Sequence, residues 1–116
     1  MFDNESSRIM KALTSALVER QQLLSNNLAN FETKNYVRQD LDFGRLLNNL
    51  KNGTSATSDG SESAIARARY RDHSRPMNIE SEMSKLYDNH LRYLLMVKSV
   101  SHHYEHMKKA LEVRAT

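Results

Sequence analysis

The sequence contains no cysteine, no tryptophan, three glycines and one proline among its 116 residues. Without cysteine it can form neither disulfides nor thiolate metal sites. So little glycine and proline argues against a turn-rich β-sandwich. No apolar run approaches the roughly 18 residues that a membrane-spanning helix needs. The first residues, MFDNESSRIMKAL, also lack the basic start and continuous apolar stretch of a cleavable signal peptide. We therefore expect a soluble protein, or one exported by a route that removes no signal.

Charge and hydropathy narrow the class of protein only moderately. The formal net charge is +3 and the isoelectric point is about 9.3, a mild basic excess that permits nucleic-acid binding without requiring it. Hydrophobic residues make up 39% of the chain and the mean hydropathy is −0.71. These values are low for a compact globule but suit long helices that share one apolar seam.

The N-terminal part has helical periodicity from about Glu5 to Asn30. Apolar residues recur at spacings of three, four and seven, which places them on one side of a helix; they are Met10, Leu13, Leu17, Leu24, Leu28 and Phe31. No glycine or proline interrupts this stretch. We predict one long amphipathic helix.

The C-terminal part carries an unbroken heptad pattern that begins near Asn78, a plausible N-cap. The pattern consists of Ile79, Met83, Leu86, His90, Tyr93, Val97, Val100, Tyr104, Met107 and Leu111. A helix from Ile79 to about Val113 is ~50 Å long, too long to close a core by itself. The sequence therefore predicts a mainly α fold, in which two long terminal helices pack as an antiparallel hairpin or coiled coil.

The middle of the chain differs in composition from both ends. Lys51–Ser63 is almost wholly polar or glycine, and we expect it to be flexible because it has little apolar surface to bury. Ala64–Arg71 alternates small or apolar residues with arginine and is typical of a short strand with one basic face. We accordingly divide the chain into an N-terminal helix with its following loop (residues 1–50), a variable middle (51–77) and a C-terminal helix (78–116).

The stretch that follows the first helix is rich in asparagine. Asn27 lies beside the apolar seam, where a buried amide costs stability but fixes register. Asn30 can satisfy the last helix carbonyls, and Thr33 and Asn35 favour a tight turn. Tyr36, Leu41 and Phe43 then follow in a predicted loop, as large side chains that pack back on the helices or await another subunit.

This stretch resembles the N-terminal signature of the bacterial flagellar rod proteins, in particular the proximal rod proteins of the FlgB type. The matching positions are Ala16, Leu17, Arg20, Leu24, Asn27, Ala29, Asn30, Thr33, Tyr36, Asp40, Asp42 and Phe43. The C-terminal helix is similar to the closing helix of that family at Glu82, Met83, Asn89, Leu91, Tyr93 and Lys109. Lys34 and Asn35 stand where the family has Pro-Gly, which loosens the turn.

The resemblance implies a structural protein whose terminal helices pair and line a tubular wall. Members of the family are exported by the flagellar type III apparatus and stack helically into the periplasmic rod of the basal body. The implied partners are other copies, other rod proteins, and the MS-ring and export-gate proteins at the rod base. No cofactor, nucleic acid or membrane span is implied.

Several residues invite chemical interpretations that we weigh against simpler ones. His102 and His106 are four apart and could hold a metal, although a solvated helix flank is the simpler reading. His90 is expected to be an interior histidine. The arginines of residues 67–75 could grip nucleic acid, or only face solvent or an acidic neighbour. Asp40 and Asp42 are expected to form a salt bridge with an adjacent subunit rather than a catalytic pair.

The sequence has no glycine-rich phosphate loop, serine elbow or metal-ligand cluster, and we interpret the protein as non-enzymatic. The residues expected to form the core motif or contact other subunits are Leu24, Asn27, Asn30, Thr33, Tyr36, Asp40, Asp42, Phe43, Met83, Tyr93, Leu94, Val97 and Tyr104. The alternative hypothesis is a helical-hairpin adaptor that binds a partner helix or nucleic acid.

Overall fold

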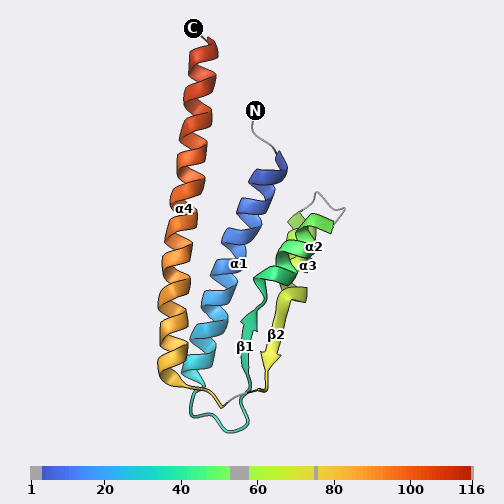
Figure 1. Ribbon diagram of the computed structural model, residues 1–116, viewed down its shortest axis with the longest axis vertical. Coiled ribbons are helices and arrows are strands. Elements are labelled where there is room, and N and C mark those ends of the chain that lie inside the picture. The colour runs from blue at the N-terminus through green and yellow to red at the C-terminus, as the bar shows by residue number, and fades with distance from the viewer. Residues whose placement is uncertain (1–3, 53–57, 75, 116) are drawn as a thin grey trace.

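The computed structural model describes residues 4–52, 58–74 and 76–115. In chain order the elements are α1 (Asn4–Ala29), β1 (Arg38–Leu41), α2 (Phe43–Asn52), α3 (Ser58–Ala68), β2 (Arg69–Asp72) and α4 (Ile79–Ala115). The molecule is long and flat, with extents of 64 × 29 × 17 Å. Figure 1 shows three columns: α4 along one edge, α1 in the middle, and the two strands continued by α2 and α3 on the far side.

The two long terminal helices are confirmed and pack against each other, running in opposite directions (Figure 1). Asn78 caps α4 as predicted, because its Oδ1 accepts the backbone N–H groups of Glu80 at 2.9 Å and Ser81 at 3.3 Å. With 37 residues against 26, α4 extends past the start of α1 (Figure 1). The two helices therefore cannot cover each other along their full length.

The face that α4 presents to α1 differs from the predicted seam. The buried and half-buried positions of α4 repeat mainly at spacings of four and three; they are Glu82, Lys85, Leu86, Asn89, Tyr93, Met96, Val100, His103 and Met107. Four of the ten predicted seam residues belong to this set, namely Leu86, Tyr93, Val100 and Met107. Four others, Met83, His90, Val97 and Tyr104, lie one residue further round the helix and are exposed, as are Ile79 and Leu111. The prediction of an interior His90 is therefore wrong, since Glu82 and Asn89 take the inward positions beside it.

The main hydrophobic core lies on the opposite side of α1 from α4. Its members come from α1, β1, α2 and α3; they are Ala12, Ala16, Leu23, Leu41, Leu46, Leu50, Ala64, Ile65 and Ala68. Four of the nine are alanines, whose small side chains let the backbones of α1 and α3 approach closely. Burial of the leucines supplies the main stabilisation.

The extended part predicted for the middle of the chain is confirmed at β2, but most of the described middle is helical. Lys51 and Asn52 belong to α2 and residues 58–68 form α3, while residues 53–57 lie outside the described residues. The strand predicted for Ala64–Arg71 begins only at Arg69. Helical pairing decides this, because Leu46 and Leu50 are one turn apart and bury their side chains against α3 and α1. The leucines lie before the polar run, so its composition did not reveal them.

The turn before β1 and the start of α2 follow from local backbone chemistry. Asn35 has φ of 65°, the left-handed conformation predicted for it. β1 and β2 pair antiparallel, with Arg38 opposite Asp72. Asp42 then caps α2, since its Oδ1 accepts the Arg45 backbone N–H at 3.1 Å.

Leu46→Ala tests whether α2 belongs to the cooperative fold. Leu46 is fully buried, so we expect its truncation to lower the free energy of unfolding by about 2–5 kcal/mol, measured by urea denaturation followed by circular dichroism. The control Val18→Ala removes an exposed side chain of α1 and should change stability by less than about 0.5 kcal/mol. Equal stability of the two variants would contradict a folded α2.

Candidate functional site

A cluster of buried polar side chains joins α1, β1 and the first half of α4. We call it the polar cluster; it consists of Arg20, Asn27, Arg38, Asp40, Glu82 and Asn89. Buried groups of this kind are tolerated only when they are paired, because isolation in the interior costs each of them several kcal/mol.

Asn27 uses both ends of its side-chain amide. Its Nδ2 donates to the Gln39 carbonyl at 2.8 Å and to Glu82 Oε2 at 3.1 Å, and its Oδ1 accepts the Gln39 N–H at 2.9 Å. The Tyr36 hydroxyl donates to the same Oδ1 at 3.3 Å. With 0% exposure, the amide takes the place of a neighbouring strand along the edge of β1. One side chain thus joins α1, β1 and α4, in the register-setting role predicted for it.

A continuous row of ion pairs runs through the cluster. Arg20 Nε donates to Asp40 Oδ1 at 2.7 Å, and Arg38 Nη2 donates to Asp40 Oδ2 at 3.3 Å. Arg38 also donates from Nε to Glu82 Oε1 and from Nη1 to Asp72 Oδ2 at 3.1 Å. Arg38 is thereby paired with three carboxylates from three elements and Arg20 with one, so every charge in the row has a partner of opposite sign.

The electrostatics of the cluster favour the charged forms. Burial by itself would raise the pKa of Asp40, but hydrogen bonds from Arg20 and from the Leu41 N–H, with the charges of both arginines, hold that pKa below its usual value. Burial would likewise lower the pKa of Arg38, yet Glu82 and Asp40 more than offset it and raise that pKa. At the edge of the cluster, hydrogen bonds from Ser74 lower the pKa of Asp72 to about 2.

Asn89 fastens α4 to α1 two turns beyond Glu82. Its Nδ2 donates to the Leu17 carbonyl and to Gln21 Oε1, both at 2.9 Å, and its Oδ1 accepts from Arg20 at 3.5 Å. Glu82 and Asn89 lie one heptad apart, on the same side of α4. Together they fix which side of α4 faces α1.

The predicted motif residues divide between the cluster and the surface. Leu24 and Asn27 are buried, Asn30 and Thr33 form a local exposed turn in which the Thr33 hydroxyl donates to Asn30 Oδ1 at 3.1 Å, and Phe43 begins α2 under the Arg20 guanidinium at 6.0 Å. Asn30 also bonds the Asn26 carbonyl at 2.8 Å, so its predicted contact with the last helix carbonyls is confirmed.

The intersubunit salt bridge expected of Asp40 is wrong, because its carboxylate is buried against two arginines of the same chain. Asp42 is exposed and serves as a helix cap. Sequence reasoning missed Arg38 altogether and singled out Glu82 only as a position that resembles the rod-protein family. Arg38 and Asp40 are two residues apart and therefore lie on the same face of β1. Nothing in a short charged stretch of sequence indicates that this face is buried.

The buried carboxylates of the polar cluster are already occupied, because those of Asp40 and Glu82 both bind arginine. Within the described residues no group of three or more His, Asp or Glu side chains is placed to hold a metal. His102 and His106 are exposed, with rings stacked at 6.5 Å, and no third donor among the described residues joins them. Arg69, of the basic strand, pairs with Glu19 at 2.6 Å. None of the described helices combines the length and apolar character of a membrane span.

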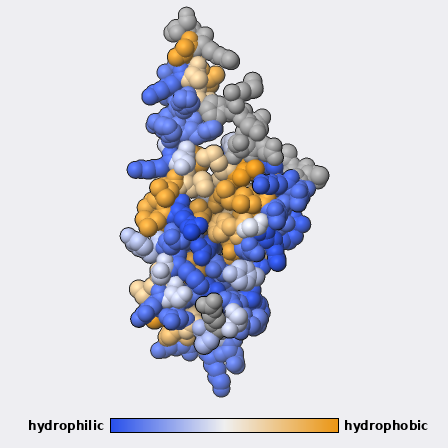
Figure 2. Space-filling view, in the orientation of Figure 1, coloured by the Kyte–Doolittle hydropathy of each residue, from blue (hydrophilic) through white to orange (hydrophobic). Residues whose placement is uncertain are grey.

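The most conspicuous surface feature is a row of apolar side chains along α4 that α1 does not cover. We call it the exposed stripe; it consists of Met83, Tyr87, Leu91, Leu94, Leu95, Val97 and Tyr104. Three of its members, Met83, Val97 and Tyr104, come from the predicted seam, while Tyr93 is half-buried against α1. Figure 2 shows hydrophobic surface on α4 midway along the molecule, bordered by hydrophilic surface.

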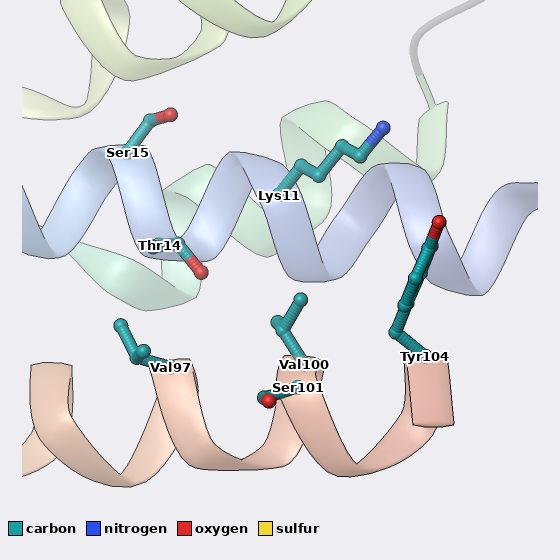
Figure 3. A pocket seen from close by; sticks show the side chains of 7 residues that line it. All are labelled: Lys11, Thr14, Ser15, Val97, Val100, Ser101 and Tyr104. Atoms are coloured by element: carbon teal, nitrogen blue, oxygen red, sulfur yellow. The ribbon is translucent and has the colours of Figure 1, made fainter. Parts of the chain in front are cut away.

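A groove of about 630 Å³ lies between α1 and α4 where the stripe approaches α1 (Figure 3). On the α4 side it is lined by Val97, Val100 and Tyr104, whose ring reaches across toward α1. On the α1 side it is lined by Lys11 and Thr14, among other residues. Apolar residues of one helix thus meet polar residues of the other, and the packing there is incomplete. A shorter groove of about 310 Å³ continues it toward His90 and Tyr93.

No protein-family model and no curated protein sequence matches this chain.

Asn27→Leu tests the polar cluster. The leucine is close in size but removes the amide partner of Glu82 Oε2 and of the Gln39 backbone groups, so we expect a loss of about 2–4 kcal/mol in the free energy of unfolding, measured with urea. The neighbouring Asn26→Leu changes an exposed side chain and should shift stability by less than about 0.5 kcal/mol. A similar loss in both variants would show that the amide pairing is unimportant.

The cluster also predicts acid sensitivity. Asp40 binds a proton less tightly in the folded state than in the unfolded state, where its pKa is about 3.9. Its stabilising effect is therefore complete above that pH and is lost as the pH falls below it, and Asp72 acts in the same direction. Urea midpoints measured between pH 7 and pH 2.5 should fall steeply only below about pH 4.

Asp40→Asn is the control for this pH dependence. The amide cannot ionise, so the variant should be less stable than the wild type at pH 7 and should lose less stability on acidification. An unchanged acid slope in this variant would assign the effect to other carboxylates.

Proposed function

We propose that the chain is a structural subunit of the bacterial flagellar basal-body rod, of the proximal type. In this proposal it assembles helically through its terminal helices and transmits torque. The observation that carries the proposal is the meeting of the motif residues in one buried cluster. Arg20, Asn27, Tyr36, Asp40, Glu82 and Asn89 carry the resemblance to that family, lie as far as 69 residues apart, and form one set of contacts.

The contacts within the cluster give these residues one structural role, the orientation of α4, which suits an assembly protein. It holds α4 so that Glu82 and Asn89 face α1, while Tyr87, Leu91 and Leu95 of the exposed stripe face away from it. A single chain gains nothing from exposing so much apolar surface, and such patches mark surfaces that bind other proteins. In a helical array the same stripe is covered by neighbouring molecules, and heterologous contacts that do not close a ring produce a filament.

The remaining parts of the proposal follow from the resemblance. The partners are other copies, related rod proteins, and the MS-ring and export-gate proteins at the base. The location is the periplasmic rod, reached through the flagellar type III apparatus. The coiled-coil seam of α4 then extends between subunits, and no enzymatic step is involved.

Leu94→Asp tests the proposal in flagellated cells that lack the chromosomal gene and express the variant. Leu94 is 48% exposed, so the substitution should leave the fold intact while placing an unpaired carboxylate in the proposed contact. We expect secretion to continue, incorporation into purified basal bodies to fall by about tenfold or more, and motility to be lost.

The matched control is Ala66→Asp, an apolar-to-acidic change at an exposed position of α3. It should be incorporated normally if the contacts run through α4. Full motility of cells that carry Leu94→Asp, or normal motility of the gene deletion, would overturn the proposal.

The second candidate function is an adaptor that binds a single partner helix, and the groove between α1 and α4 favours it. Capture of one helix in a defined one-to-one complex, without incorporation into basal bodies, would identify the adaptor. Binding to nucleic acid would instead weaken steeply with salt, whereas contacts made by apolar burial would not.

A further inference from the structure

The side of α4 that points away from α1 carries a row of exposed apolar side chains with charged residues beside it. Tyr87, Leu91 and Leu95 follow one another at intervals of four residues, so their side chains form a continuous row. Tyr87 is 68% exposed and Leu95 66%. Figure 1 shows why this row is uncovered: α4 forms one edge of the molecule, and α1 lies on one side of it only.

Charges of opposite sign accompany this row. Glu80 and Asp88 lie on the N-terminal half of the same outer side, and Lys98 follows Leu95 toward the C-terminus. All three are exposed, and Asp88 pairs with Arg92 one turn away. The outer side of α4 therefore carries acidic side chains toward its first turns and a basic one beyond the apolar row.

We propose that this outer side of α4 binds the same side of a second copy of the chain, in an antiparallel pair with its twofold axis at Leu91. Residues equally distant from Leu91 then face each other, so that Tyr87 packs on Leu95 of the second copy and Leu91 on its own equivalent. Glu80 lies opposite His102, and Lys98 lies within one turn of Asp88. The contact is isologous, since each molecule supplies the same patch.

Charge selects the antiparallel direction over the parallel one. A parallel pair in register places Asp88 against Asp88 and Lys98 against Lys98, which is unfavourable, and it also aligns the two helix dipoles. The antiparallel pair replaces these repulsions with two equivalent approaches of Lys98 to Asp88, one on each side of the axis. The apolar row supplies the attraction and the charges supply the direction.

The inference goes beyond the proposed rod function and does not depend on it. A twofold pair is closed, whereas rod assembly is open-ended, so the pair is a state of the free subunit. A monomeric free subunit would overturn the pair and leave the incorporation test of the rod proposal unaffected.

Because the chain has no cysteine, disulfide trapping tests the geometry directly. Under a mild oxidant, Leu91→Cys should form covalent dimers rapidly, because residue 91 meets its own equivalent at the axis. Tyr87→Cys alone should cross-link at least about tenfold more slowly, while an equimolar mixture of Tyr87→Cys and Leu95→Cys should give the mixed dimer. Equal cross-linking of Leu91→Cys and Tyr87→Cys would indicate parallel or random contact and overturn the proposal.

Sedimentation equilibrium of the full chain tests the energetics. We expect the wild type to have twice the mass of the 13.4 kDa chain at submillimolar concentration, and Leu95→Glu to weaken dimerisation about tenfold or more. Leu111→Glu is the matched control: it lies on the same helix, is 58% exposed and falls outside the pairing region, so its dimerisation should be unchanged. A monomeric wild type, or equal weakening in both variants, would overturn the proposal.

A charge exchange completes the test. Lys98→Glu should weaken the dimer, and the double variant Asp88→Lys with Lys98→Glu should restore it, because the opposite charges then face each other again. Asp88 pairs only with Arg92 one turn away at an exposed site, so the fold should tolerate this change. Failure of the double variant to recover would exclude the antiparallel register.

Discussion

The contact among Asn27, Arg38 and Glu82 determines much of the remaining geometry. Three elements that are distant in sequence meet there: the end of α1, the start of β1 and the first turns of α4. Each group is buried, and each would be costly if its partner were displaced. Misalignment at this one point would therefore be costly, and the contact fixes the register of α4 against α1 and of the two-stranded sheet against both.

Ionic clusters of this kind contribute more to uniqueness than to stability. Desolvation offsets much of the attraction in buried ion pairs, and an apolar set of the same shape often stabilises a fold comparably. What the cluster adds is a fixed rotation of α4 about its own axis. An apolar seam alone would allow α4 to rotate until its leucines and valines faced α1, as the heptad pattern predicted. Glu82 and Asn89 prevent this rotation, and the apolar residues next to them remain outside.

The two sides of α1 therefore pack in different ways. Toward α2 and α3 it packs through Ala12, Ala16 and Leu23 into a dry core that holds the small domain together. Toward α4 it meets a mixed surface with polar anchors at one end and incompletely filled grooves further along. Because of this asymmetry, α4 is held against α1 mainly near its N-terminus, and its apolar surface further along is available to other molecules.

The sequence by itself determined the extent of α1 and α4, the cap at Asn78 and the left-handed turn at Asn35, since these depend on periodicity and on the preferences of single residues. The tertiary structure decided the features that such local signals do not specify. The helices α2 and α3 exist because Leu46 and Ile65 find a common core, and the rotation of α4 follows from hydrogen bonds between residues 55 and 72 positions apart. Local patterns specify which side of a helix is apolar, but only long-range polar pairing specifies which side turns inward.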